Sequence, residues 1–427
     1  MVERYSTIRE VSMRRVIRKC IRLFIFASSL PISLILILLF PLYKIKWFYL
    51  RSDRIGHYAM NTELLLCYLD RIQTQQKKTT VIFYLSEAPI CNNQLHLMWK
   101  RIIFIFPFAA LADYIDRTMA LILGKYYKNK GILELGCADR HESLKQYPSH
   151  LSFTQDEKIQ GEVLLQKLGV SKQFKWVCIL ARDSAYLDQY LSGMNWAYHN
   201  FRDCDIDNFK KTALFLANNG YYVIRMGKSV KKPFFVDHPN VIDYANHSLR
   251  SDFLDIYLSA HCEFFISTAT GLDSVPKIFR RPVLLVNIAP IKGQLEYFYP
   301  NELFIFKKFY DQNQQRYLSL QEVDCELNSC HDVQYEATKR NWVIVENTED
   351  EILEVTQEMC KKMNMKENIN KANAIQAMLS KPYLFSGIMD RELLKDHPEK
   401  FYVKIGEHFM ENNTFLFHGI KDECEFA

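Results

Sequence analysis

The sequence predicts an α/β protein made of two Rossmann-like domains, with a hydrophobic membrane segment near its N-terminus. Three observations support this fold class. The chain of 427 residues is longer than one ordinary α/β domain. After residue 46, short β-branched and aromatic runs alternate with helical patterns, as in doubly wound α/β proteins. Before them, Leu23–Tyr43 contains no charged residue over 21 positions, which is long enough to cross a bilayer.

The expected organisation has four parts. Residues 1–46 form a basic region and membrane anchor, 47–172 a first domain, 173–365 a second domain, and 366–427 a helical appendage. Hydrophobic residues make up 48% of the chain, and Gly and Pro are few, at 14 and 13 residues. Such a composition leaves little room for disorder.

Charge and cysteine usage exclude several classes of protein. The net charge of +5 is modest, and cations alternate with acids along most of the chain, so nucleic acid is not an expected partner. The eleven cysteines are scattered and form no CxxC or CxxH pair, which argues against a zinc or redox site. They are expected to be free thiols of a reducing compartment.

The apolar run has a basic cluster on each side. The cations of these flanks are Arg14, Arg15, Arg18, Lys19, Arg22, Lys44, Lys46, Arg51 and Arg54. Residues 14–54 are therefore expected to bind membrane lipids with anionic head groups. A single span, a signal peptide without a small-residue cleavage site, and a hairpin or monotopic insertion broken at Pro31 are the alternatives. The last would keep the main body in the cytoplasm.

Strands and helices follow from hydrophobic periodicity. The expected strands are Trp47–Leu50, Thr80–Leu85, Ile102–Phe106, Trp176–Leu180, Tyr221–Ile224, Val241–Tyr244, Glu263–Ser267, Pro282–Asn287 and Val343–Val345. Helices are expected over Asn61–Ile72 and Ala109–Tyr126. Three more helices have N-terminal caps at Thr154, Asp205 and Thr348, and the first two are expected to end at Gly169 and Gly220.

Ligands of open parallel sheets bind where strands end, so residues directly after the strands are candidates for a binding site. Arg182-Asp183-Ser184 follows one expected strand, and Arg225-Met226-Gly227 follows the next. The turn Ser267–Ser274 lies between a strand and a helix, where free backbone N–H groups favour an anion such as a diphosphate. Asn287 ends a fourth strand. A structural ion pair and an ordinary turn are the alternative interpretations.

The first domain offers a candidate proton acceptor. His57 lies in Arg54-Ile55-Gly56-His57 after the first strand, and an imidazole can deprotonate a hydroxyl near neutral pH. A histidine that only satisfies a strand–helix turn is the alternative. Glu63, Asp183 and His199 are rival bases.

The sequence gives little support for metal binding or for methyl transfer. No grouping has metal-ligand spacing, since Asp205 of Asp203-x-Asp205 is better used as a helix cap, so neither a metal nor a cofactor is expected. Ile132–Ala138 (ILELGCA) is similar to the first motif of S-adenosylmethionine-dependent methyltransferases, but it lacks the second glycine that lets the chain pass under the cofactor.

An ordered series of short motifs resembles a family of bacterial glycosyltransferases associated with surface-carbohydrate genes. The series consists of Arg54–His57 with Asn61-x-Glu63, Asn92–Leu95, Arg182–Tyr186, His199–Arg202, Arg225–Gly227, Asp252–Leu258, the glycine-containing loop before Pro276, Val286-Asn287 and Glu346-Asn347-Thr348. It runs from about residue 50 to 365. The chain departs from the family at Asp203, where asparagine is more frequent.

The resemblance implies a GT-B-like fold, with the acceptor on the first domain and a nucleotide-activated sugar on the second. The residues expected at the donor are Arg182, Ser184, His199, Arg202, Arg225, Gly227, Thr268, Thr270, Gly271, Ser274 and Asn287. The expected activity is metal-independent transfer of a hexose-type unit to a lipid-linked or surface-glycan acceptor, at the cytoplasmic face of a bacterial inner membrane. A non-catalytic protein that binds sugar nucleotides or glycans is the alternative.

Overall fold

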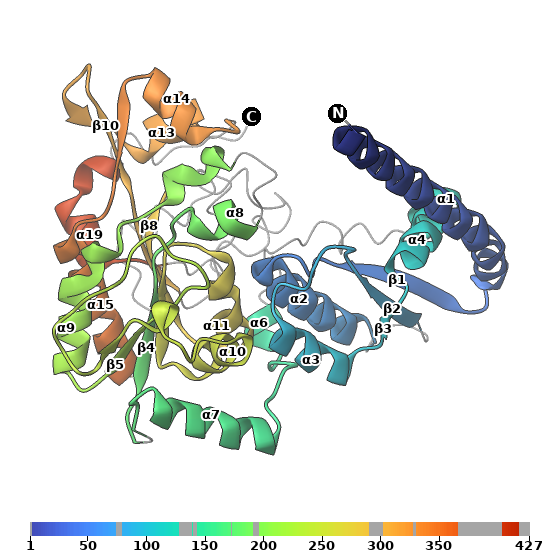
Figure 1. Cartoon of the computed structure of the whole chain (residues 1–427). Coiled ribbons are helices and arrows are strands. Elements are labelled where there is room, and N and C mark those ends of the chain that lie inside the picture. The colour runs from blue at the N-terminus through green and yellow to red at the C-terminus, as the bar shows by residue number, and fades with distance from the viewer. Residues whose placement is uncertain are drawn as a thin grey trace. The chain divides into compact units, whose positions relative to one another are not determined.

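The structure is a computed structural model of the whole chain, shown in Figure 1. It describes residues 2–73, 79–127, 139, 143–171, 173–190, 196–289, 302–327, 330–365 and 404–417. The chain divides into two compact units, Met1–Cys137 and Ala138–Ala427, and both are mixtures of helices with parallel strands. The predicted domain limits at 172 and 173 remain a prediction. The methyltransferase-like motif at 132–138 lies outside the described residues.

The first unit begins with a long helix, α1 (Val2–Leu39). This helix continues through Pro31, so the predicted hairpin broken at that residue is wrong. The hydroxyl groups of Ser29 and Ser33 donate to the carbonyl oxygens of Phe26 and Ser29, and such bonds help a long helix tolerate an internal proline. Among the described residues, Val16–Leu39 is the one helical stretch long and apolar enough to cross a membrane.

Three parallel strands form the sheet of the first unit, in the order β1-β2-β3. The elements after α1 are β1 (Lys44–Leu50), α2 (Ile55–Gln73), β2 (Thr79–Leu85), α3 (Asn93–Ile102), β3 (Ile105–Phe106), α4 (Ala109–Leu123) and η1 (Gly124–Tyr126). The three predicted strands are therefore present, but Ile102 ends a helix instead of beginning a strand. Helix α3 was not predicted, although Asn92 caps it by accepting a hydrogen bond from the Leu95 amide at 2.8 Å.

The second unit contains a seven-stranded sheet in the order β13-β9-β8-β7-β4-β5-β6, with every pair parallel. Its strands are β4 (Trp176–Leu180), β5 (Tyr222–Arg225), β6 (Val241–Ile242), β7 (Phe264–Ser267), β8 (Val283–Ile288), β9 (Leu303–Phe306) and β13 (Lys404–Ile405). The central strands β4, β7 and β8 are buried almost throughout, which explains their continuous apolar sequences. Strand β13 comes from the predicted C-terminal appendage and is a strand at the edge of this sheet.

Helices cover both faces of the seven-stranded sheet, as in a doubly wound fold. Figure 1 shows α9, α15 and α19 on one side and α10 and α11 on the other. The helices of this unit are α6 (Ser143–Gln146), α7 (Gln155–Lys167), α8 (Ala185–Tyr190), α9 (Lys210–Asn218), α10 (Asp252–His261), α11 (Ser274–Ile278), α13 (Leu320–Leu327), α14 (Val333–Lys339), α15 (Glu349–Met365) and α19 (Glu407–Asn412). Short 3-10 turns are η2 (Ala197–Arg202), η3 (Ile206–Phe209), η4 (Tyr244–Asn246), η5 (Gly271–Asp273) and η7 (Thr414–Phe417).

The three predicted helix caps are confirmed. Thr154 and Glu157 form a capping box at the start of α7. Thr348 and Glu351 exchange the same pair of hydrogen bonds ahead of α15. Asp205 accepts from the Asp207 amide at 2.8 Å where η3 leads into α9. Local sequence thus fixes where these helices begin.

A second, antiparallel sheet has the strand order β11-β10-β12. Its strands are β10 (Lys308–Asp311), β11 (Arg316–Tyr317) and β12 (Trp342–Val345). The predicted strand Val343–Val345 therefore exists, but it belongs to this small sheet and is partly exposed instead of buried. Its apolar residues pack against a local cluster that contains Phe309 and Ala337.

Helix α7 packs against α10 inside the second unit. Gly161 faces the ring of Tyr257 so closely that a Cβ atom at this position would lie 2.1 Å from the ring. The ring of Phe153, just before α7, lies 5.3 Å from that of Tyr257 and 5.6 Å from that of Phe279. These contacts assign α7 to the second unit.

Candidate functional site

The four predicted strand-end segments lie at one edge of the seven-stranded sheet. Strands β5, β4, β7 and β8 are consecutive neighbours and run parallel, so their carboxyl ends share an edge. The segments that follow or end these strands contain Arg225, Arg182, Thr268 and Asn287. The predicted convergence of these segments is therefore confirmed by the strand order.

This edge contains a point where the direction of strand addition reverses. From β4 the chain adds β5 and β6 on one side, and then returns to add β7, β8 and β9 on the other. Ligands of open α/β sheets bind at such a switch point. Here, between β4 and β7, the backbone N–H of Arg182 donates to Oγ1 of Thr268 at 2.9 Å.

The guanidinium of Arg182 is buried beside this point, since the residue is only 8% exposed. Its Nη1 donates to the His199 carbonyl oxygen at 3.1 Å and also to Oδ1 of Asp203. Its Nη2 has no hydrogen-bond partner among the residues that the structure describes. Burial, followed by the charge of Arg202, lowers the pKa of Arg182 to about 9, so the group remains cationic at neutral pH.

A second buried basic side chain contacts the same segment. Nζ of Lys307, directly after β9, donates to the Asp203 carbonyl oxygen at 2.5 Å, and Lys307 is 3% exposed. Burial lowers the pKa of Lys307, and the charge of Arg182 lowers it further, whereas Glu346 raises it. Lys307 and Asp203 were not predicted as site residues. An apolar strand followed by a lysine was the signal that could have identified Lys307.

Asp183 and Ser184 brace the loop that follows β4. Oδ1 of Asp183 accepts from the Ala185 amide and Oδ2 from the Lys231 amide, each at 2.9 Å. The hydroxyl of Ser184 donates to Asp188 at 2.5 Å. Because both carboxylate oxygens of Asp183 hold backbone amides, this geometry suits a positioning residue better than a proton acceptor.

Arg225 lies deeper than predicted. It is 1% exposed, and its Nη1 donates to Oδ1 of Asp243 at 3.0 Å, directly after β6. Its Nη2 donates to the Lys232 carbonyl oxygen at 3.3 Å. A Cβ on Gly227 would lie 2.6 Å from Cγ1 of Val230, so this glycine allows its own loop to close tightly. These contacts are internal, so they indicate a structural role for Arg225, and its predicted contact with a donor stays a prediction.

The turn after β7 is braced from within by Asp273. Oδ2 of this carboxylate accepts from the Ser267 hydroxyl at 3.0 Å and from the Thr270 amide at 2.8 Å. The turn continues through Gly271 into η5 and then into α11, which begins at Ser274 and has only five residues. The Thr270 amide, which was expected to face an anion, is therefore already used inside the turn.

Two residues at this edge have left-handed backbone conformations without being glycine. Ala269 has φ +54° after β7, and Asn287 has φ +56° within β8. Such conformations cost about 1–3 kcal/mol each and are concentrated at functional sites. Their presence on neighbouring strands marks the same edge as the polar contacts.

Asn287 forms a reciprocal clamp with Asn347. The backbone N–H of Asn287 donates to Oδ1 of Asn347 at 2.7 Å, and the backbone N–H of Asn347 donates to Oδ1 of Asn287 at 2.6 Å. Nδ2 of Asn287 also donates to Sγ of Cys204 at 3.0 Å. Both asparagines are 1% exposed, so Asn287 holds the chain together instead of facing a donor.

Aromatic side chains surround His199 in η2. Its ring stacks on Trp196 at 6.0 Å with an interplanar angle of 9°, and it lies 3.9 Å from the Tyr198 ring. Tyr198 in turn lies 4.6 Å from His331. Arg202 ends the same 3-10 turn. The backbone of this segment contacts the site, because the Arg182 guanidinium donates to the His199 carbonyl oxygen.

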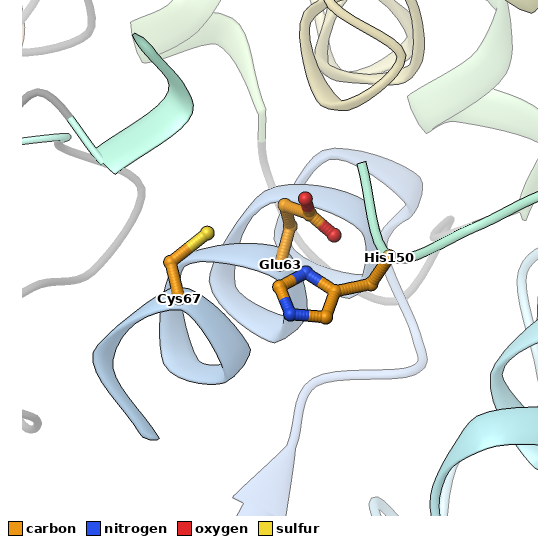
Figure 2. Close-up of side chains that lie close together, drawn as sticks. All are labelled: Glu63, Cys67 and His150. Atoms are coloured by element: carbon orange, nitrogen blue, oxygen red, sulfur yellow. The ribbon is translucent and has the colours of Figure 1, made fainter. Parts of the chain in front are cut away.

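The first unit contains the other candidate residues on α2. His57 lies in the first turn of this helix, and burial, with further contributions from Arg51 and Arg54, lowers its pKa to about 4. Glu63 is fully buried and lies one helical turn before Cys67, as Figure 2 shows. Figure 2 also labels His150, which belongs to the second unit. The low pKa of His57 leaves its imidazole neutral at pH 7.

Comparisons with known proteins give a likeness in structure alone. No family model matches the chain, and no curated protein matches its sequence. A glycosyl transferase family 9 structure from Veillonella parvula is 10% identical in sequence and has a TM-score of 0.39. The matched region covers 62% of this chain and 86% of the Veillonella chain. The E. coli ADP-heptose lps heptosyltransferase II is 12% identical in sequence and has a TM-score of 0.37. The matched region covers 76% of this chain and the whole of the E. coli chain.

A third similar structure is the iron-containing dodecameric glycosyltransferase TibC from enterotoxigenic E. coli. It is 12% identical, covers 76% of each chain, and has a TM-score of 0.34. All three proteins are glycosyltransferases by name. At these TM-scores the likeness assigns no donor, acceptor or residue role to this chain.

Proposed function

We propose that the second unit binds the diphosphate of a nucleotide-activated sugar at the edge formed by β4 and β7, and that the chain is a glycosyltransferase. The observation that carries this proposal is the Arg182 guanidinium. It is buried at the switch point, and its Nη2 has no acceptor within the described part of the chain. A buried donor without an acceptor costs about 1–3 kcal/mol, and a phosphate oxygen would remove that cost.

Neighbouring cations strengthen the preference for an anion. The charge of Arg202 lowers the pKa of Arg182, and the charge of Arg182 lowers the pKa of Lys307. Basic groups are therefore gathered here at an energetic cost. A diphosphate leaving group develops negative charge as the sugar is transferred, and fixed cations stabilise that charge without reorganisation. In this proposal Arg182 and Arg202 bind the diphosphate, while Lys307 and Asp203 fix the position of Arg182.

The remaining parts of the proposal come from the sequence. The motif series resembles bacterial glycosyltransferases associated with surface-carbohydrate genes, and its members Arg182–Tyr186 and His199–Arg202 lie around this edge. The proposed acceptor is a lipid-linked or surface glycan, with His57 as the base and no metal required. Residues 14–54 would hold the chain on the cytoplasmic face of a bacterial inner membrane.

A ligand panel tests the proposal. The protein is mixed with ADP, UDP, GDP, dTDP and CMP, and with the sugars activated by each, and thermal stability is followed. A nucleotide at 100 times its dissociation constant should raise stability by about 2.7 kcal/mol. Release of the free nucleotide in the presence of membrane glycolipids then measures transfer. Binding without release would favour the non-catalytic alternative, and no stabilisation by any nucleotide would contradict the proposed site.

A further inference from the structure

Helix α1 is docked sideways on the first unit for much of its apolar length. The rings of Phe26 in α1 and Tyr114 in α4 lie 5.4 Å apart, and those of Phe40 and Tyr127 lie 6.1 Å apart. The residue that comes later in the first segment, Phe40, contacts the residue that comes later in the second, Tyr127. Helices α1 and α4 therefore lie side by side and run in the same direction. The distance along α1 from Phe26 to its last residue, Leu39, is about 20 Å at the rise of an α-helix.

This docking is inconsistent with a helix that crosses the bilayer. The hydrocarbon core is about 30 Å thick, so a spanning α1 would take α4 and its polar groups into lipid. Asp113 and Arg117 form an ion pair on the exposed surface of α4, with Arg117 75% exposed. Ile115 and Met119 of α4 also pack in one cluster with Trp47 of β1 and Tyr84 of β2, so α4 is attached to the sheet. Open sheets do not occur in the hydrocarbon region, because their edge amides would lack partners.

Exposed apolar side chains continue from α1 onto the end of α4. Leu121 is 84% exposed, Ile122 60% and Tyr126 74%. Leu123 of α4 packs in the same cluster as Leu36 and Ile37 of α1, which places these exposed residues beside the C-terminal half of α1. The exposed apolar residues there are Ile32, Leu34, Ile35, Leu38 and Leu39 of α1, followed by Leu42 and Tyr43 directly after the helix.

Cations surround this apolar surface. Arg18, Lys19 and Arg22 precede it on α1, Lys44 follows it, and Lys125 lies in η1, directly after α4. All five are exposed. An apolar surface bordered by lysine and arginine fits the boundary between acyl chains and anionic head groups. The charge and the apolar area therefore indicate one partner, the surface of an anionic bilayer.

We propose that α1 lies in the plane of an anionic membrane surface and that the end of α4 together with η1, residues Leu121–Tyr126, inserts beside it. This inference deepens the membrane contact in the proposed function, and it does not depend on the sugar donor. It predicts that both ends of the apolar stretch lie on the same side of the membrane. It also predicts that α4 contributes to membrane affinity, which a spanning α1 would not require.

Vesicle flotation tests the role of α4. Full-length protein is floated with vesicles of phosphatidylcholine alone or with phosphatidylglycerol added. Binding should require the anionic lipid, and L121E/I122E should lower the partition coefficient at least tenfold. Leu97→Glu, at an exposed position of α3, is the matched control and should bind like the wild type. Circular dichroism melting confirms that each variant is folded. Unchanged flotation of L121E/I122E would overturn the proposal.

Cysteine labelling tests the orientation of α1. Cys20 is exposed before the apolar stretch, and Lys44→Cys places a thiol after it at an exposed position outside the apolar surface. Sealed membrane vesicles from expressing cells are treated with a maleimide that cannot cross the bilayer, and each peptide is quantified by mass spectrometry. Both thiols should be labelled equally from one side. Protection of only one of them would show that α1 spans the membrane, whatever the outcome of the donor experiments.

Discussion

The backbone N–H of Arg182 donates to the hydroxyl oxygen of Thr268 at 2.9 Å, and this bond joins the ends of β4 and β7. It lies where the order of strand addition reverses, and the guanidinium of the same arginine donates to the His199 carbonyl oxygen and to Asp203. Removing the acceptor should therefore affect both stability and donor binding. The contact links the fold to the proposed chemistry.

Thr268→Val replaces the hydroxyl with a methyl group of similar size. It leaves a buried N–H without its acceptor, which should cost about 1–3 kcal/mol of unfolding free energy. Donor affinity should also fall, because the Arg182 backbone is no longer fixed. Thr268→Ser keeps the hydroxyl and serves as the control in denaturant unfolding and ligand titration. Equal stability of the valine and serine variants would contradict the structural role of this bond.

Arg225→Ala should act mainly on stability. The substitution leaves Asp243 without its buried partner, and breaking a pair of this kind costs about 3–5 kcal/mol. The midpoint of urea unfolding should fall accordingly, while protein that remains folded should bind the donor with nearly wild-type affinity. A stable variant with strongly reduced donor affinity would instead restore the direct role expected from the sequence.

The predicted base His57 gives a distinctive pH dependence. An imidazole accepts a proton only when neutral, and burial with the nearby arginines lowers its pKa to about 4. The acid limb of kcat/KM should therefore lie near pH 4, and the rate should fall as pH falls through that value. Arg51→Gln removes one of the charges that lower the pKa and should move this limb to higher pH. A wild-type limb near 6.5 would point to another base.

Gly161→Ala tests the docking of α7 on α10. The added Cβ would lie 2.1 Å from the Tyr257 ring, and such overpacking costs about 1–3 kcal/mol. The gain in helix propensity, about 1 kcal/mol, offsets part of this cost. The melting temperature should therefore fall, and the effect of Gly161→Ala should disappear in a Tyr257→Ala background. An alanine variant more stable than the wild type would show that α7 is not packed in this way.

The local features of the fold were predictable from sequence. Trp176–Leu180 was predicted with the limits that β4 has, because a run of five apolar residues after Lys175 is typical of a buried parallel strand. Caps such as Asp205 were predictable because their hydrogen bonds span only a few residues. The gathering of strand ends at one edge also followed, since parallel strands share the direction of their carboxyl ends.

The partners of the site residues were not predictable. Arg182 bonds to Asp203, 21 residues away, and Asn287 bonds to Asn347, 60 residues away. These pairs are set by strand order, which periodicity does not reveal. The burial of Arg225 was not predicted for the same reason. Its partner, Asp243, follows β6, a neighbouring strand of only two residues.

Calorimetric titration of Arg182→Lys with the nucleotide-activated sugar that stabilises the wild type tests whether Arg182 binds the diphosphate of the donor. Lysine keeps the charge but lacks the Nη2 donor of arginine. The dissociation constant should therefore rise at least tenfold, which corresponds to about 1.4 kcal/mol of binding free energy. Arg280→Lys, whose arginine binds the carbonyl oxygens of Tyr147 and Pro148, is the matched control and should bind the donor normally. An unchanged dissociation constant for a folded Arg182→Lys protein would contradict the account.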